Sequence, residues 1–213
     1  MGGATVVHPF DDAAVICGQG TIGLELRDQV VEKLDAILVP VSGGGMLGGI
    51  AAACAGSGTR VVAVEPAGKR LGEALASGTR VVVSDAELEA SPTLATVADA
   101  MPTRLLGPEN AWPLVYGLVE DVARPRRESA RRTADAFRSP QVLTVDDAMI
   151  EAAMRVTATE LKQAVEPAGA VALAGALSPA FAALRDRRGF KNVGLVVCGG
   201  NVDLATLGRV LAG

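Results

Sequence analysis

The sequence predicts an α/β fold, a three-layer sandwich with a mostly parallel sheet between two layers of helices. Short strand-like apolar runs alternate along the chain with helix-like runs, a pattern typical of parallel sheets covered on both faces. The chain has 213 residues and is 49% hydrophobic, enough to bury a substantial core. Only 3% of the residues are aromatic, so small aliphatic side chains must pack the helices onto the sheet.

The first half of the chain predicts two strand–helix units. Residues 35–41, DAILVPV, form a continuous apolar run typical of a buried strand, and the glycines after it lead into a helix through about Ala55. Residues 59–66, TRVVAVEP, predict a second strand that Pro66 stops. Residues 68–78 predict a short helix that ends at a glycine.

The second half continues the alternation. Residues 110–122 have helical apolar spacing, and residues 143–165 form a long amphipathic pattern with Asp146 as a candidate N-cap. Residues 168–186 predict one or two buried helices, because a proline interrupts the run. Residues 192–213 predict a strand, a glycine turn and a closing helix.

We expect residues 1–213 to form a single unit with one irregular excursion. Residues 123–140, ARPRRESARRTADAFRSP, are rich in arginine and bounded by prolines, which is typical of a solvated surface insertion. A phosphate- or partner-binding patch is the alternative interpretation of this segment. No other part of the sequence indicates contact with nucleic acid.

Composition limits the partners and the compartment. A net charge of -4 provides no electrostatic reason to bind nucleic acid or an anionic membrane. The three cysteines are odd in number and widely spaced, which argues against a disulfide framework and for a reducing compartment. No apolar run reaches membrane-spanning length, and the first residues lack the pattern of a signal peptide. We therefore expect a cytoplasmic protein.

A glycine loop between the first strand and its helix is the main candidate binding site. Consecutive glycines let successive backbone N–H groups converge on an anion without a Cβ in the way, and the helix N-terminus adds positive partial charge. The alternative is a tight turn in which glycine is needed only for packing. The predicted phosphate cradle consists of Ser42, Gly43, Gly44, Gly45 and Met46.

The same loop also matches a dinucleotide fingerprint, G-x-G-x-x-G, at Gly43, Gly45 and Gly48, with Glu65 ending the next strand at about the right distance. A second run, GQGTIG, has the same spacing without a matching acid, which indicates how easily glycine-rich sequence produces the pattern. The loop is not a Walker A loop, because no Gly-Lys-Ser/Thr follows it. The glycines of the second run are Gly18, Gly20 and Gly23.

Five motifs in one order resemble the serine/threonine dehydratase and serine racemase family, which are pyridoxal-phosphate enzymes of fold type II. They are HPFDDAAVICGQGTIGLEL, VPVSGGGMLGGIA, VVAVEPAG, VEPAGAVALAG and VVCGGNVDL, and together they extend over nearly the whole chain. The resemblance implies that the sandwich corresponds to the large domain of these enzymes. It also implies that the glycine loop binds the phosphate of pyridoxal 5'-phosphate.

The resemblance extends to further cofactor-binding residues. Cys198, with Gly199 beside it, matches the position whose Ser or Cys side chain faces the pyridine nitrogen. A neutral thiol donates only weakly there, which suits elimination chemistry. Glu166 matches a family acid near the cofactor, and Pro9 and Phe10 match a stretch that leads toward the ring. The alternatives are a core cysteine at Cys198 and a helix cap at Glu166.

A divalent-cation site of many relatives is not expected to be complete here. Glu65 matches its first ligand, but no acid occupies Lys69 to Leu71, where a later carboxylate should fall. The sole histidine, His8, is expected to have a structural role. Ala100 departs from the family pattern, since relatives usually carry glycine at this position near the cofactor.

The lysine that forms a Schiff base with the cofactor in this family lies in a Ser-x-Lys-x-Arg-Gly-like stretch, which is absent here. None of the lysines has that context, so we expect no catalytic residue within this chain. The resemblance implies the C-terminal portion of the enzyme, inactive alone and completed by an N-terminal catalytic partner or present as a homo-oligomer. The lysines are Lys33, Lys69, Lys162 and Lys191.

The whole enzyme implied by the resemblance removes water from L-serine or L-threonine by β-elimination and produces a 2-oxo acid and ammonia, with racemisation as a related branch. Two alternatives stay open at this point. One is a non-catalytic module that binds pyridoxal phosphate or phosphate. The other is a Rossmann-type dinucleotide-binding domain.

Overall fold

The computed structural model describes residues 3–80, 96–101, 106–119 and 142–213. Its four strands form one parallel sheet, in the order β3-β2-β1-β4. The predicted α/β fold with a parallel sheet is therefore confirmed. The Arg-rich segment at 123–140 lies outside the described residues. The strands are β1 (Ala36–Pro40), β2 (Arg60–Pro66), β3 (Val142–Val145) and β4 (Val193–Leu195).

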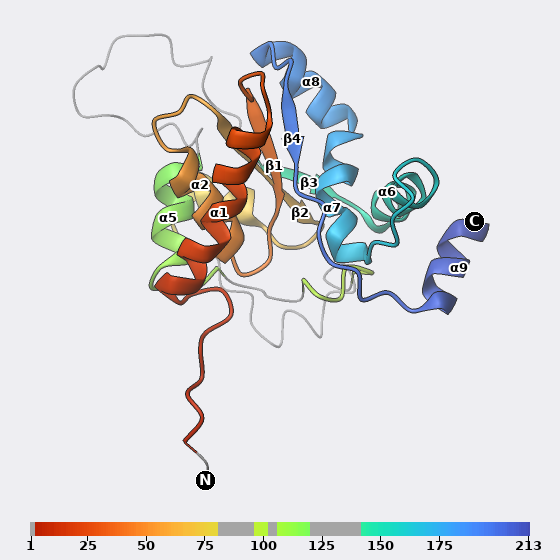
Figure 1. The fold of residues 1–213 in the computed structure, drawn as a ribbon, viewed down its shortest axis with the longest axis horizontal. Coiled ribbons are helices and arrows are strands. Elements are labelled where there is room, and N and C mark those ends of the chain that lie inside the picture. Colours follow the sequence, from red (N-terminus) through yellow and green to blue (C-terminus); the bar gives the residue numbers. More distant parts are fainter. Residues whose placement is uncertain (1–2, 81–95, 102–105, 120–141) are drawn as a thin grey trace.

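Helices cover both faces of the sheet, as the predicted sandwich requires (Figure 1). One layer contains α1 (Ala13–Gln29), α2 (Gly45–Cys54), α3 (Leu71–Ser77) and α5 (Ala111–Leu118). The other layer contains α6 (Asp147–Thr159), α7 (Pro167–Ala176) and α8 (Pro179–Arg188), with α9 (Leu204–Ala212) packed outside α6.

Strand β1 lies at the centre of the sheet, and all five of its residues are buried. Ala36 and Leu38 pack into the core on the α6–α8 side, whereas Ile37 and Val39 pack into the core on the α1–α2 side. A strand buried on both faces needs apolar residues at every position, because successive side chains point to opposite sides. This requirement explains why the run reads as continuously apolar.

Local signals in the sequence set most of the helix boundaries. The Asp146 carboxylate accepts a hydrogen bond from the Met149 amide at 2.9 Å, so the predicted N-cap of α6 is present. The long run at 168–186 is two helices: Ser178 caps α8, and Pro179 is its first residue. Helix α3 ends at Gly78, whose φ of 71° is the left-handed conformation typical of a C-cap glycine.

Two elements differ from the sequence-based expectation. Residues 142–145 form the edge strand β3 rather than the start of a helical pattern, and α6 already ends at Thr159. Four residues are too few for an alternating pattern to stand out beside a strongly periodic helix. Helix α1 was not expected as a helix, and the whole GQGTIG run lies inside it.

Glycines let α1 and α2 pack at very short range. A Cβ on Gly20 would lie 2.9 Å from the Gly49 carbonyl oxygen, and a Cβ on Gly49 would lie 2.3 Å from the Ile16 carbonyl oxygen. These contacts are with backbone, which cannot move aside as a flexible side chain can. The GQGTIG run therefore serves helix packing, and it is no dinucleotide loop.

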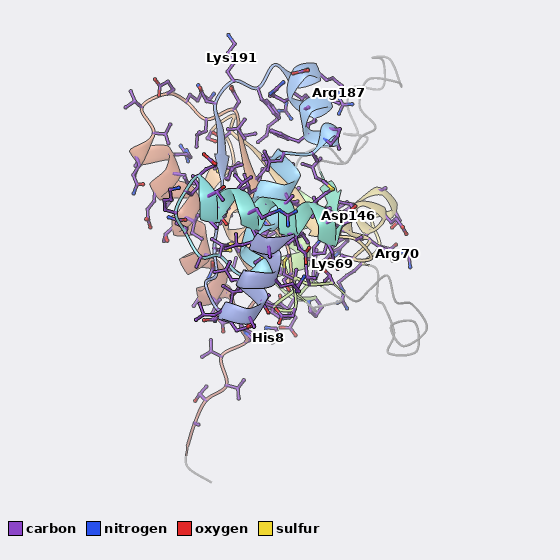
Figure 2. All side chains as sticks on the ribbon, turned by 90° about the vertical axis from the view of Figure 1, so that its right-hand side faces the viewer. His8, Lys69, Arg70, Asp146, Arg187 and Lys191 are labelled. Atoms are coloured by element: carbon purple, nitrogen blue, oxygen red, sulfur yellow. The ribbon has the colours of Figure 1, made fainter. Side chains whose placement is uncertain are left out.

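The amino and carboxyl edges of the sheet lie toward opposite ends of the molecule. Lys191, just before β4, is at one end, and His8, on the segment before α1, is at the other (Figure 2). No single helix in the described ranges is long and apolar enough to cross a membrane. Helices α7 and α8 reach that length only together, at a bend of 49°.

Candidate functional site

The strand order places a crevice at the carboxyl edge of the sheet. The chain runs from β1 outward through β2 to β3 and then returns to place β4 on the other side of β1. At such a switch point the connections leave neighbouring strands in opposite directions, and ligands bind in the crevice between them. A cavity of about 540 Å³ lies here, lined by the loops after β1 and after β4.

The glycine loop after β1 offers unpaired backbone donors to this cavity. Among the described residues, no acceptor takes a hydrogen bond from the amides of Gly43, Gly44, Gly45 or Met46. All four residues and Ser42 line the cavity. The amides lie at the N-terminus of α2, where helix geometry leaves N–H groups free and adds positive partial charge. This arrangement suits an anion such as a phosphoryl group.

The loop needs glycine at two positions for clear steric reasons. Gly44 has a φ of 91°, a left-handed conformation that other residues adopt only with strain. At Gly43 the Phe10 ring packs directly on the Cα, and an added Cβ would lie 2.2 Å from the ring. Phe10 and Pro9 line the cavity, as expected for the stretch that precedes α1.

A buried carboxylate organises the segments around the loop. Asp11 is only 8% exposed, and its two carboxylate oxygens accept hydrogen bonds from the amides of Glu109, Asn110 and Ala111 at 2.8–3.0 Å. Burial by itself would raise the pKa of Asp11, but these three hydrogen bonds hold the pKa below its usual value. No role for Asp11 is predicted from the sequence, because none of these partners is near it in the chain.

The loop after β4 forms the opposite wall. Cys198 and Glu166 line the cavity together with Gly169. Partial burial of the sulfur and the nearby Glu166 carboxylate raise the pKa of the Cys198 thiol, so the thiol is neutral at pH 7. A Cβ on Gly169 would overlap the Cys198 carbonyl oxygen, so only glycine lets α7 approach this loop.

Glu166 binds the loop after β4 rather than the start of its own helix. Its side chain does not cap its own helix, α7, but accepts a hydrogen bond from the Asn201 amide at 2.8 Å. Its backbone amide donates to the carbonyl oxygen of Gly199 at 3.1 Å. Gly199 has a φ of 78° and packs against the Glu166 side chain. Glu166 therefore holds the loop after β4 in place while it faces the cavity.

At the end of β2, Glu65 is covered by the segment that follows the strand. Glu65 is 3% exposed, and its carboxylate accepts a hydrogen bond from the Leu71 amide at 2.9 Å. Burial raises the pKa of Glu65 to about 7 and lowers that of the neighbouring Lys69 to about 8. In the described part of the chain, no three His, Cys, Asp or Glu side chains cluster as metal ligands.

His8 has the structural role that was expected. Its Nδ1 accepts hydrogen bonds from the amides of Asp11 at 3.0 Å and Phe10 at 3.4 Å, and its ring packs edge-on against Phe10. Residues 99–101 also line the cavity, and they include Ala100. Within the described ranges, no lysine lines the cavity.

The donor set fits pyridoxal phosphate. Free amides at a helix N-terminus suit its phosphate, a neutral thiol on the opposite wall suits its pyridine ring, and a cavity of about 540 Å³ is large enough for such a ligand. Fold and site together define an α/β protein with a candidate phosphate-binding cavity at the switch point of a parallel sheet.

Comparison with known proteins identifies the family. A family model described as pyridoxal-phosphate dependent enzyme matches residues 1–199, so the chain belongs to this family, and the resemblance inferred from the motifs is confirmed. Serine racemase of Arabidopsis thaliana is 35% identical over 208 residues, which are 96% of this chain and 54% of that protein.

Solved structures agree with this assignment. Maize serine racemase matches with a TM-score of 0.76 and 37% identity, over 99% of this chain and 55% of that one. The threonine deaminase isoform 2 of Solanum lycopersicum matches with a TM-score of 0.74 and 28% identity, over 99% of this chain and 50% of that one. The chain thus spans about half the length of the relatives it matches.

Proposed function

We propose that this chain binds pyridoxal 5'-phosphate in the cavity at the carboxyl edge of the sheet. The observation that carries the proposal is the set of unpaired amides from Gly43 to Met46, which face a cavity and have no acceptor among the described residues. In the proposed complex these amides, with Ser42 beside them, hold the phosphate. A dianion there also interacts favourably with the N-terminus of α2.

The opposite wall determines how the ring is held. In the proposed complex Cys198 faces the pyridine nitrogen, with Gly199 and Glu166 supporting the loop that carries it. Pyridoxal phosphate, when bound, draws electrons away from the α-carbon of an amino acid. A neutral thiol leaves the ring nitrogen without a full positive charge, and this favours elimination or racemisation over transamination.

The complete protein is proposed to act on a hydroxy amino acid such as L-serine or L-threonine, either as an ammonia-lyase that produces a 2-oxo acid and ammonia or as a racemase. The names of the relatives support this proposal: serine racemase, threonine deaminase and the L-threo-3-hydroxyaspartate ammonia-lyase of Saccharomyces cerevisiae, which is 31% identical. The chain contributes the phosphate cradle and the ring wall.

A binding experiment tests the proposal. Purified chain is titrated with pyridoxal 5'-phosphate and with NAD by calorimetry, and each titration is repeated in the presence of inorganic phosphate. The proposal expects binding of pyridoxal phosphate that inorganic phosphate weakens, and little binding of NAD. Preferential binding of NAD would instead support a dinucleotide-binding domain.

A second candidate is a module that binds the cofactor without catalysis. The observation in its favour is that none of the lysines of the chain lines the described part of the cavity. Both candidates expect no turnover of L-serine or L-threonine by this chain alone. Addition of a second chain that carries a Ser-x-Lys-x-Arg-Gly stretch separates the two candidates. If this chain is part of an enzyme, the mixture should gain activity on L-serine or L-threonine, and its oligomeric state should change. If it is a non-catalytic module, neither should happen.

A further inference from the structure

Asp11 connects two segments that are far apart in the sequence, its own and residues 107–111. Its carboxylate Oδ1 accepts hydrogen bonds from the amides of Asn110 and Ala111 at 2.8 and 2.9 Å, and Oδ2 accepts one from Glu109 at 3.0 Å. The Asn110 side chain donates back to the main-chain oxygen of Asp11. Gly107 packs so tightly on this carboxylate that an added Cβ would lie 2.2 Å from its Cγ.

Both segments that meet at Asp11 also contact the glycine loop. Phe10 precedes Asp11 in the chain, and its ring covers Gly43. From the other segment, Leu106 packs against Gly44, so that an added Cβ would lie 2.4 Å from its Cδ2. The Gly107 amide donates to the Gly43 carbonyl oxygen at 3.0 Å.

The hydrogen bond from Gly107 fixes the direction in which the Gly44 N–H group of the loop points. In a planar trans peptide the C=O and the next N–H point to opposite sides. When Gly107 holds the Gly43 carbonyl on one side, the Gly44 amide is directed to the other. The carboxylate that holds Gly107 in place therefore acts on the orientation of a phosphate donor without touching the ligand.

We propose that Asp11 is a positioning residue for phosphate binding, because its carboxylate holds Phe10 and the segment 106–111 against the glycine loop and so keeps the loop amides directed into the cavity. The inference rests on the proposed function, since it concerns the same site. Asp11 also caps α5, and the experiment must separate this cap from an effect on the ligand.

Two probes make the separation: pyridoxamine 5'-phosphate and pyridoxamine, which differ only in the phosphoryl group and carry no aldehyde to react with surface lysines. The ratio of their affinities, measured by calorimetry, reports the contribution of the phosphate cradle. Asp11→Asn keeps the shape of the side chain but replaces one acceptor oxygen by an amide that cannot accept a hydrogen bond. We expect the ratio to fall about tenfold, because hydrogen bonds to a charged group are directional and strong.

Asp12→Asn is the matched control. Asp12 adjoins Asp11 and caps α1 through the amides of Ala14 and Val15, but it has no contact with the segment 106–111 in the described hydrogen bonds. Asparagine is an equally good N-cap, so this variant should keep the ratio of the parent chain. Asn110→Ala, which removes only the donor to the Asp11 main chain, is a milder second variant with an intermediate expected ratio, and thermal unfolding verifies that each variant is folded.

The outcomes distinguish failure of the proposed cofactor binding from failure of the positioning role of Asp11. If the parent chain binds both probes equally well, the proposed function is wrong, and this inference is overturned with it. If the parent chain prefers the phosphorylated probe and folded Asp11→Asn or Asn110→Ala keeps that preference, only the positioning role is wrong. A loss of affinity for both probes by the same factor would mean that Asp11 acts as a plain helix cap.

Discussion

Two runs in this chain share the spacing G-x-G-x-x-G, and the structure uses them in different ways. The run at Gly18 to Gly23 lies within α1, where Gly20 and Gly23 let α1 approach α2. The run at Gly43 to Gly48 starts in a loop after a buried strand and continues into α2, where its first amides face a cavity. Glycine spacing alone therefore does not indicate a ligand. The preceding strand and the unpaired amides distinguish the second run as the candidate site.

The largest effect concerns Glu65, the acid that would complete a dinucleotide fingerprint on the second run. The folded chain keeps a proton on Glu65 up to about pH 7, whereas the ordinary pKa is 4.5. Between these values the folded state binds more protons than the unfolded state, so the free energy of unfolding falls as pH rises. The difference corresponds to about 3 kcal/mol.

Denaturant unfolding from pH 5 to pH 8 measures this dependence. Glu65→Gln should flatten it, while Glu73→Gln, the same change at an exposed position of α3, should leave the slope as it is. The Glu65 side chain contacts the Leu71 amide and Lys69 and does not line the cavity. The Glu65→Gln variant should therefore bind pyridoxamine phosphate with the affinity of the parent chain. A loss of NAD binding in Glu65→Gln would support the dinucleotide interpretation instead.

The second prediction tests the glycine loop. Gly44→Ala forces a side chain into a left-handed backbone conformation and toward Leu106, so the loop must rearrange. We expect the affinity for pyridoxamine phosphate to fall about thirtyfold, or about 2 kcal/mol, as amides turn away from the phosphate. Calorimetry measures this loss. If folded Gly44→Ala bound pyridoxamine phosphate with unchanged affinity, the run at Gly43 to Gly48 would no longer differ from the run at Gly18 to Gly23 in binding a ligand.

The third prediction concerns the run inside α1. Gly20→Ala should destabilise the fold by about 1–2 kcal/mol, because its Cβ would meet the Gly49 backbone. Gly18→Ala, in the same run with open space around it, should instead stabilise the fold by about 0.5–1 kcal/mol through higher helix propensity. Neither change should alter phosphate affinity. Opposite signs in denaturant unfolding would establish a packing role, and a change in affinity would contradict it.

The smallest effect is expected from metal ions. The Glu65 carboxylate already has the Leu71 amide and the Lys69 ammonium beside it. Addition of Mg²⁺ or Ca²⁺, or their removal with a chelator, should therefore leave the thermal unfolding midpoint unchanged. A rise of the midpoint with cation concentration, removed in Glu65→Gln, would mean that this strand end binds a cation after all.

The central part of the fold could be predicted from the sequence because its signals are local. A continuous apolar run produced β1, and side chains next to helix starts identified caps such as Asp146. Strand β3 and helix α1 could not be predicted in the same way. The first is only four residues long, and the second is defined by its packing on α2, which a single sequence does not reveal.

The same division holds for the candidate site. The glycine loop and the loop with Cys198 could be located from motifs, because each follows a predicted strand. The role of Asp11 could not be predicted, since its partners lie about a hundred residues away and are backbone amides without a sequence signature. Tertiary hydrogen bonds of this kind become visible only in the folded chain.

The direct measurement is an amide NMR titration of the isotope-labelled chain with pyridoxamine 5'-phosphate, with pyridoxamine as reference. We predict large phosphate-dependent shifts for the amides of Gly43, Gly44, Gly45 and Met46, and none for Gly18 or Gly20. If the loop amides stay unmoved while the ligand binds, or if the shifts map to α1, the phosphate is held elsewhere and the assignment of the site is wrong.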